Sequence, residues 1–381
     1  MKYLKDYIER KRSCLTGCED FVSIAKVEDF PVFFGVTDKP EEEDLYAVME
    51  WFLEKETGLI QLNKLIPLDV LYQEQHAYGF GETWENHYLK FSNFLCQTKP
   101  LEVLEIGAGQ GRIAQICTSQ EGVNNWTIIE PNPTFEETEK IKVITGFFDR
   151  QFNFNSDFDT YTFSHVLEHA YDPKDFLTCI HEKMRICDNL IFSYPNLKAW
   201  LTKKFTNSLN FEHTIFLTVE HLEELLKNIG FVIIRREDYL DHSHFFHVQK
   251  GVVPEVPIKY SNYSDENKQL LMDFVQFHID EVNVLNNKLK DFTAKSVYLF
   301  GAHIFSQYLK VFGLNTSSIV SVLDNSSQKV GKRLYGTNLF VQHPEVLRER
   351  ENPIVILRAG PYNEEIKAQI LSTINNQTTF I

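Results

Sequence analysis

A glycine-rich segment followed by an acid is the pattern most typical of ligand binding in this sequence. Residues 101–112 read LEVLEIGAGQGR, an apolar run with glycines at 107, 109 and 111 before a predicted helix. Glycine lets the backbone turn tightly at the end of a strand and lets a ligand approach without an obstructing Cβ. Glu130 ends the run WTIIEP, 21 residues after Gly109. A carboxylate there accepts both hydroxyls of a ribose, so the pair predicts a nucleotide-type ligand.

Two further groups of residues have acid–base or metal-binding character. His165, Glu168 and His169 spell H-x-x-E-H, in which two histidines on one helical face hold zinc in some proteases. A protease would leave the glycine loop and Glu130 without a role, so we reject that interpretation and predict no metal. Glu212 and His213 are adjacent, and a carboxylate beside an imidazole suits proton transfer near neutral pH. A surface-paired loop histidine is the alternative, and the two residues alone do not decide.

The elements that must position these residues alternate between short apolar runs and helical stretches. The runs are LEVLEIG, WTIIEP, KVITGF, TYTFSH, NLIFSYPN and FVIIRRE. Such alternation predicts a mostly parallel sheet with helices on both faces. After a long predicted helix that begins near Ser264, the strand pattern resumes in KSVYLFGAH, IVSVLDN and PIVILRAG. We predict an α/β protein with an irregular α+β segment over 1–92, a Rossmann-like module over 93–250, and a linker helix with a second, smaller Rossmann-like module over 251–381.

Composition narrows the classes of partner and compartment. The chain has 381 residues, 43% hydrophobic and 24% charged, which is the composition of a globular protein. Its formal net charge of -15 argues against nucleic acid or an anionic membrane as the main partner. The first twelve residues, MKYLKDYIERKR, predict neither a signal peptide nor an anchor. Six scattered cysteines predict a reducing, cytoplasmic location.

The form E-x-G-x-G-x-G, with FSHVLEHAYDP and FSYPN after the later strands, resembles class I S-adenosylmethionine-dependent methyltransferases. In that family the glycine loop faces the methionine part of the cofactor. The resemblance implies S-adenosylmethionine as cofactor and a set of residues that contact it. These residues are Glu105, Gly107, Ala108, Gly109, Gly111, Arg112, Glu130, Pro131, Phe147, Ser164 and His165.

Over its whole length the chain resembles the sugar C-methyltransferases of deoxysugar pathways, the tetronitrose type, which methylate carbon 3 of a dTDP-4-keto-6-deoxysugar. The shared features include GLIQL, VLYQEQHAYG, EIGAGQG, the Glu-His pair and DYLDHSH. The most specific are GAHIFSQYLKVFGL, SVLDNSSQKVGKRLYGT and VILRAGPYNEEI near the C-terminus. In that family the C-terminal domain helps to hold the nucleotide-sugar, so the resemblance implies a nucleotide-sugar substrate.

The resemblance also implies a mechanism. A base removes the proton on carbon 3, which the neighbouring keto group acidifies, and the resulting enolate attacks the electrophilic methyl group. We expect His213 to be the base and Glu212 to orient it. His169 and Tyr78 are expected to bind or polarise the sugar oxygens. An O- or N-methyltransferase and a non-catalytic cofactor-binding component remain alternatives, and the oligomeric state stays undecided.

The sequence departs from this family at two places. The family has an N-terminal zinc module with two cysteine pairs, whereas this chain has only Cys14 and Cys18, with Glu54 and Thr57 where the second pair is expected. Because a closed structural site needs four ligands, we predict no structural zinc. The second departure concerns residues expected to line the substrate site, where the family has an aromatic hydroxyl and a Gly-Gly-Ser loop. This chain has Asn210, His242, Ser243 and His244 there.

The C-terminal module partly imitates a dinucleotide-binding fingerprint. Gly301 is followed by Ala302 and His303, with Asp324 about 23 residues further on, but the second and third glycines are missing. We therefore reject a nicotinamide cofactor. An anionic nucleotide-sugar needs a local positive site, and we expect it among four basic residues of this module. They are Lys329, Lys332, Arg333 and Arg358.

Overall fold

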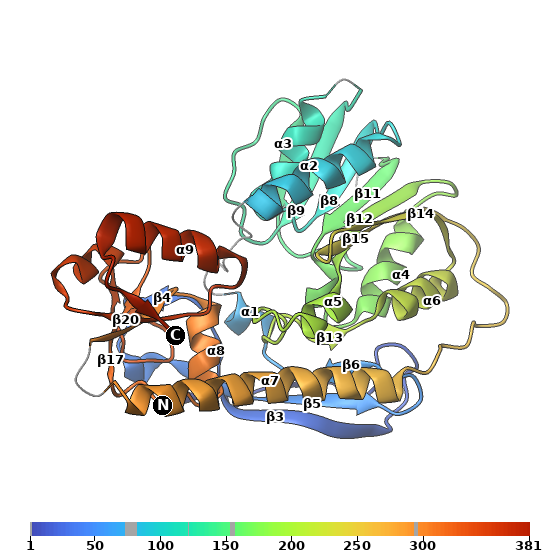
Figure 1. Ribbon diagram of the computed structural model, residues 1–381. Helices are drawn as coiled ribbons and strands as arrows, with labels where there is room; N and C mark the ends of the chain where they lie inside the picture. Colours follow the sequence, from blue (N-terminus) through green and yellow to red (C-terminus); the bar gives the residue numbers. More distant parts are fainter. Residues whose placement is uncertain (1, 73–81, 121, 153–156, 293–295) are drawn as a thin grey trace.

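The computed structural model describes residues 2–72, 82–120, 122–152, 157–292 and 296–381. Within these ranges the chain forms three larger sheets, one for each module (Figure 1). Among the helices of the described part, none combines the length and the apolar character needed to cross a membrane.

The central module has a seven-stranded sheet, ordered β10-β9-β8-β11-β12-β15-β14. The strands from β10 to β12 are parallel, whereas β15 is antiparallel to both β12 and β14. The strands are β8 (Glu102–Ile106), β9 (Asn125–Glu130), β10 (Ile141–Thr145), β11 (Thr160–Ser164), β12 (Asn189–Pro195), β14 (Phe231–Tyr239) and β15 (Ser243–Lys250).

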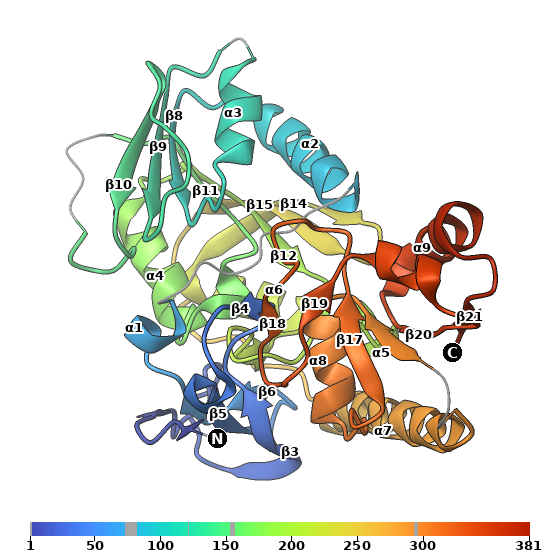
Figure 2. The same ribbon diagram turned by 90° about the vertical axis from the view of Figure 1, so that its left-hand side faces the viewer.

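Helices pack on both faces of this sheet, as the alternating pattern of the sequence predicts. Helix α2 packs with α3, and α4 packs with α6 on the opposite face (Figure 2). Thr218 caps α6 by accepting a hydrogen bond from the His221 amide, and Gly230 ends that helix in the left-handed conformation. The helices are α2 (Glu82–Cys96), α3 (Arg112–Thr118), α4 (Pro173–Lys183), α5 (Leu197–Thr202) and α6 (Val219–Ile229).

The N-terminal module is a five-stranded sheet that borrows one strand from the central module. Strands β3 and β5 form a long antiparallel ribbon, and β13 pairs with β6 to complete the sheet. The strands are β1 (Lys2–Tyr3), β3 (Phe21–Pro31), β5 (Leu45–Glu54), β6 (Ile60–Leu62) and β13 (Ile215–Phe216). A short pair, β2 (Ile8–Glu9) with β7 (Lys64–Leu65), and the turn α1 (Leu68–Leu71) complete the segment.

A buried carboxylate organises the region where the sequence suggests a degenerate zinc module. Glu54 accepts hydrogen bonds from Ser13 at 2.8 Å, Thr57 at 2.6 Å and the Cys18 thiol at 3.0 Å, and also from Thr16. Cys14 is buried, which raises the pKa of its thiol to about 11. These residues do not fit a closed zinc site, because threonine is not a zinc ligand and the carboxylate is already surrounded by donors.

The long helix α7 (Ser264–Lys290) connects the modules by contributing to two cores. It runs alongside the N-terminal ribbon of β3 and β5 toward the C-terminal module (Figure 1). Leu271 and Phe274 belong to the large shared core, and Val282, Leu285 and Leu289 to the core of the C-terminal module.

The C-terminal module is a parallel sheet ordered β19-β17-β16-β20-β21. Helix α8 packs on α7 and the β3 ribbon, and α9 follows strand β20. The elements are β16 (Val297–Phe300), α8 (Ile304–Val311), β17 (Ile319–Leu323), β19 (Val341–Gln342), β20 (Ile354–Leu357), α9 (Asn363–Gln369) and β21 (Thr379–Phe380). The predicted α/β class, with two Rossmann-like modules behind an N-terminal sheet segment, is confirmed.

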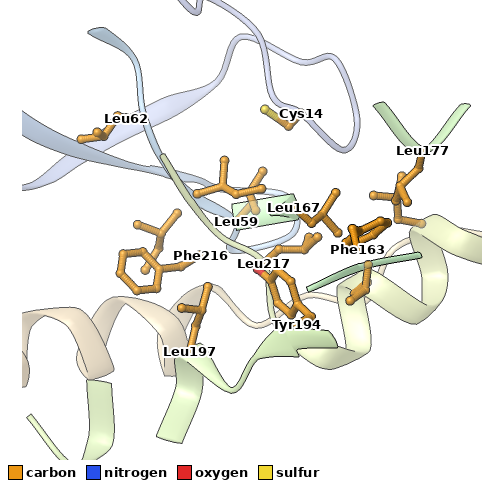
Figure 3. Packing of buried hydrophobic residues seen from close by; sticks show 14 of the residues in the cluster. Cys14, Leu59, Leu62, Phe163, Leu167, Leu177, Tyr194, Leu197, Phe216 and Leu217 are labelled. Carbon is orange, nitrogen blue, oxygen red and sulfur yellow. The ribbon is translucent and has the colours of Figure 1, made fainter. Parts of the chain in front are cut away.

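One hydrophobic core runs through the N-terminal and central modules. Figure 3 shows side chains from both in contact within a single cluster: Leu59, Leu62, Leu167, Tyr194, Phe216 and Leu217. Each fully buried side chain of this size contributes about 1.5–3 kcal/mol, so the two modules lose much of their stability if they separate. Arg10 adds a polar link, because its guanidinium donates to the carbonyl oxygens of Leu62, Thr214 and Tyr171.

A buried ion pair joins the N-terminal and C-terminal modules. Arg333 binds both carboxylate oxygens of Asp44, at 2.6 and 2.7 Å, and also donates to the Lys39 and Thr337 carbonyl oxygens. The pair lies beside the two-stranded sheet of β4 (Val36–Thr37) and β18 (Arg333–Leu334). Arg333 is 4% exposed. The expectation that it binds a nucleotide is wrong, because its guanidinium is held inside this contact between the modules.

Removing Arg333 should therefore destabilise the protein. Arg333→Gln leaves Asp44 as a buried, uncompensated charge, and we expect a loss of about 3–5 kcal/mol in the free energy of unfolding, measured by urea titration. The matched control is Lys332→Gln, because Lys332 pairs at 3.4 Å with Asp38 at a more exposed position. Equal urea midpoints for the two variants would contradict the structural role of Arg333.

Candidate active site

The glycine loop follows β8 and has the backbone that only glycine adopts readily. Gly107, Gly109 and Gly111 have φ angles of 70°, 56° and 66°, all in the left-handed region. A Cβ on Gly107 would lie 2.7 Å from a methyl carbon of Val166, which follows β11. The loop therefore packs directly against the segment that carries His165, Glu168 and His169.

Two acids flank the loop, and they lie in different surroundings. Glu130, at the end of β9, accepts hydrogen bonds from the Gly109 and Asn132 amides, each at 3.1 Å. It thus fixes the loop from the neighbouring strand, at the position predicted for a ribose carboxylate. Glu105 is 1% exposed and accepts from the Trp126 indole at 2.7 Å. Burial raises the pKa of Glu105 to about 8. We assign Glu105 a positioning role, because its carboxyl group faces Trp126 between the strands.

The remaining residues expected to contact the cofactor are more exposed. Arg112 forms an ion pair with Glu85 at 3.1 Å on the outside of α2 and α3, so it is engaged away from the loop. Phe147 is half exposed, with its ring 6.0 Å from that of Tyr72. Arg112 is partly buried, as are Ala108, Pro131, Ser164 and His165. Tyr78 lies outside the described residues, so its predicted role stays a prediction.

Glu168 lies between two histidines just after β11. Its Oε1 is 3.2 Å from Nδ1 of His165 and 4.0 Å from Nε2 of His169. Burial favours the neutral acid, but the hydrogen bond and charge of His165 and the charge of His169 outweigh it and lower the pKa of Glu168. Residues 167–169 form a 3-10 turn, so the two histidines of the H-x-x-E-H pattern do not share one helical face. This geometry agrees with rejecting the protease interpretation.

His213 and Glu212 are positioned by Asn210. The Asn210 side-chain oxygen accepts from the backbone amides of Glu212 at 2.8 Å and His213 at 2.7 Å. Nδ1 of His213 lies 3.3 Å from the Asn210 amide nitrogen and 3.4 Å from the Ser208 carbonyl oxygen. The groups that hold His213 Nδ1 are therefore Asn210 and Ser208.

The Glu212 carboxylate points to a different imidazole than the sequence suggests. It lies 3.6 Å from Nδ1 of His169, and the rings of His169 and His213 are 5.2 Å apart. The sequence paired Glu212 with His213 because the two residues are adjacent. Adjacent side chains on a loop can point in different directions, and these two do. Glu168, His169, Glu212 and His213 thus form one cluster, which we call the His169 cluster.

Burial changes the acid–base character of His213. Its ring is buried, and burial together with the nearby His169 lowers its pKa to about 4, although Glu168 and Glu212 act in the opposite direction. Its pKa therefore lies below the near-neutral range expected from sequence. At neutral pH the imidazole carries no charge and has a free lone pair.

The C-terminal module approaches the same region through the turn before α8. Burial lowers the pKa of His303 to about 4, and the Glu212 carboxylate is among the charges that act on it. Within the described part of the chain, Nε2 of His303 is buried without a hydrogen-bond partner. Asp324, the acid of the partial dinucleotide fingerprint, accepts hydrogen bonds from the Ala302 amide at 2.9 Å and from Lys329 at 3.0 Å. Its carboxylate is therefore already bound by donors of the chain itself.

Comparison with protein families identifies both α/β modules. Residues 75–236 match the family described as a methyltransferase domain, and residues 267–381 match the C-methyltransferase C-terminal domain. A comparison with curated proteins gave no significant match.

Solved structures similar to the chain include two methyltransferases. Human N-acetylserotonin methyltransferase in complex with SAM has 18% identity and a TM-score of 0.38, over 45% of this chain and 53% of the human chain. The chain therefore spans about half the length of that enzyme. The Burkholderia thailandensis 1,6-didemethyltoxoflavin-N1-methyltransferase has 18% identity and a TM-score of 0.36, over 45% of this chain and 82% of its own.

The fold, the glycine loop and the two family matches lead to one conclusion. S-adenosylmethionine binding follows from the methyltransferase domain, and the left-handed loop closed by Glu130 fits such a ligand. Residues 75–236 form a class I S-adenosylmethionine-dependent methyltransferase domain, and residues 267–381 form a C-methyltransferase C-terminal domain.

Proposed function

We propose that the chain methylates a carbon atom of a nucleotide-linked keto-deoxysugar. The observation that carries this proposal is the C-methyltransferase C-terminal domain, whose His303 lies within electrostatic range of the His169 cluster. Methylation at carbon requires a base that removes a proton and donors that stabilise the resulting enolate. The cluster contains groups of both kinds.

The glycine loop and Glu130 are the residues that would hold the cofactor. The exposed backbone of Gly107 to Gly111 admits the ligand closely, and the Glu130 carboxylate would accept the ribose hydroxyls. When bound there, S-adenosylmethionine supplies an electrophilic methyl group. Val166, in contact with Gly107, connects this loop to the segment that carries the acid–base residues.

His213 is the proposed base. In the tautomer whose Nδ1–H donates to the Ser208 carbonyl oxygen, Nε2 holds the lone pair that would remove the proton next to the keto group. Asn210 fixes the loop through two backbone hydrogen bonds, so the ring has little freedom. We therefore propose Asn210, and not Glu212, as the residue that orients the base.

His169 and His303 are the proposed partners of the sugar oxygens. An enolate carries its developing charge on the former keto oxygen, and donors held in place before the reaction stabilise it most. Glu212 lies 3.6 Å from Nδ1 of His169 and Glu168 lies 4.0 Å from its Nε2, so two carboxylates flank the ring and a sugar oxygen would compete with them for a ring N–H. The ion pairs of the C-terminal module mean that any nucleotide phosphate must compete for its basic residues. These pairs are Lys329–Asp324, Lys332–Asp38 and Arg358–Glu281.

Loss of Glu130 should weaken cofactor binding. In Glu130→Ala the loop loses an acceptor for the Gly109 amide, and the ligand loses a charged partner worth about 1.5–3 kcal/mol. We expect a Kd for S-adenosylmethionine about 10–100-fold higher by isothermal titration calorimetry. The control is Glu136→Ala, because Glu136 is an exposed acid in the segment that follows β9. An unchanged Kd in Glu130→Ala would argue against the assigned cofactor site.

Replacing the base should stop proton exchange while sparing the cofactor site. With a dTDP-4-keto-6-deoxysugar in D2O, we expect His213→Asn to slow deuterium uptake at carbon 3 by about 10²–10⁴-fold, followed by mass spectrometry. Binding of S-adenosylmethionine should stay unchanged, as it should in the exposed control His343→Asn.

The same exchange assay separates the alternatives. If the wild type methylates the sugar without any uptake of deuterium at carbon, the acceptor is oxygen or nitrogen. The altered residues Asn210 and His242 are the observation that favours this second candidate. If no methylation and no exchange occur with any sugar nucleotide while cofactor binding persists, the chain is a binding component.

The pH dependence of exchange should reflect the lowered pKa of His213. A base must be unprotonated, and a pKa of about 4 keeps His213 unprotonated throughout the neutral range, beside Glu168, His169 and Glu212. The rate attributed to this group should therefore stay constant down to about pH 5 and fall tenfold per unit below about pH 4. A decline that begins near pH 6.5, the ordinary value of histidine, would identify another imidazole as the base.

A further inference from the structure

Three histidines from distant parts of the sequence meet beside the cofactor loop. His87 comes from the buried face of α2, His165 follows β11, and His242 lies in the turn between β14 and β15. One ligand nitrogen from each lies within 4.8 Å of the other two. We call these residues the His87 cluster; among the residues that the structure describes, it is separate from the His169 cluster.

We propose that the His87 cluster binds a divalent transition-metal ion of the zinc class. The ring centres are separated by 5.2 Å for His87 and His165, 5.1 Å for His87 and His242, and 5.2 Å for His165 and His242. A tetrahedral ion about 2.1 Å from each nitrogen lies about 3.2 Å from each ring centre and sets the centres about 5.2 Å apart. The distances between the ring centres therefore match those of three imidazoles that coordinate one ion. Rotating the rings about their present centres would bring the three nitrogens within reach of that ion.

The surroundings of His87 and His165 indicate which nitrogen of each would face the ion. Nε2 of His87 contacts the Ser193 hydroxyl at 2.9 Å, so Nδ1 is available, and it is buried without a hydrogen-bond partner among the residues that the structure describes. Nδ1 of His165 contacts Glu168 at 3.2 Å, which leaves Nε2 as the ligand atom. A carboxylate behind a ligating histidine is the usual second shell of a zinc site. Nε2 of His165 now lies 2.9 Å from the Ser243 hydroxyl, a partner that the ion would replace.

A purely structural role leaves two features of the cluster unexplained. A buried nitrogen without a partner costs about 1–3 kcal/mol, and the contact of His87 Nε2 with Ser193 does not compensate for this cost at Nδ1. His165 has a φ of 55°, in the left-handed region that non-glycine residues seldom adopt. Strain of this kind persists where the surrounding structure requires a side chain at one position. Metal coordination accounts for both observations.

The ligand set points to the kind of ion and to its coordination. Imidazole nitrogens suit zinc, copper, iron and nickel, whereas magnesium and calcium prefer oxygen ligands. Three histidines leave a fourth position open in a tetrahedral site, as in catalytic zinc sites. The Trp84 ring lies 4.9 Å from the His165 ring and 4.6 Å from the His242 ring, so it covers one side of the cluster.

Metal titration without cofactor or sugar tests this site independently of the proposed function. Chelator-treated protein is titrated with Co²⁺ and read by visible absorption, and Zn²⁺ affinity is measured by competition with a chromophoric chelator. We expect one equivalent of four-coordinate Co²⁺ and displacement by Zn²⁺. His242→Gln, in a surface turn, should lower Zn²⁺ affinity at least about 100-fold, measured at the same pH. The matched control His244→Gln, two residues away and bonded to Asp238, should bind as the wild type does.

Two further variants distinguish loss of the metal site from misfolding and from metal binding at the His169 cluster. His242→Cys should restore binding and add a thiolate-to-cobalt charge-transfer band, which appears only if position 242 coordinates the ion. His169→Gln should leave Co²⁺ binding intact. The proposal is overturned if the wild type binds neither ion stoichiometrically, or if His169→Gln abolishes binding while His242→Gln does not.

Discussion

The site depends on one buried carboxylate that serves two groups of histidines. Glu168 is 1% exposed and faces His165 on one side and His169 on the other. Burying an unpaired carboxylate would cost several kcal/mol, so the surrounding imidazoles are what keep it ionised. In turn, it orients the His165 ring through a contact at 3.2 Å, and its charge acts on His169 at 4.0 Å. Substituting Glu168 would therefore disturb both His165, beside the cofactor loop, and His169, in the proposed substrate site. The arrangement of side chains after β11 depends on this carboxylate.

The three modules cannot be treated as independent units, because each one completes another. The central module supplies β13 to the N-terminal sheet, and the C-terminal module supplies β18 to pair with β4. Gly58 allows the start of α7 to approach closely, since a Cβ there would lie 2.5 Å from the Ser264 amide nitrogen. This interlocking places His303 of the C-terminal module near Glu212. A site whose residues come from different modules needs such rigid contacts, because a small displacement of a reacting group greatly lowers the rate of the catalysed reaction.

Patterns within a short stretch of sequence predicted the strands, turns and glycine loop, which depend on neighbouring residues. They did not predict contacts between segments that are far apart in the sequence. The glycine loop and Glu130 follow from strand and turn geometry, and both have the expected positions. Arg333 was misassigned because a basic residue in sequence carries no sign of its partner, and Asp44 lies 289 residues away. The His87 cluster escaped notice for the same reason. The sequence draws attention to His165 and His242 separately, but nothing in it places His87, on the buried face of α2, beside them.

The two histidine clusters should not act independently, because Glu168 carries one charge that both of them use. A cation bound by His165 would draw that carboxylate toward the His87 cluster and weaken its hold on His169. Trp200 reinforces the connection, since its ring lies 6.2 Å from that of His165 and 6.0 Å from that of His213. Any ligand that binds one cluster and shifts Glu168 must, by linkage, be affected equally by what binds the other. Metal affinity and substrate affinity would then both depend on the position of the Glu168 side chain.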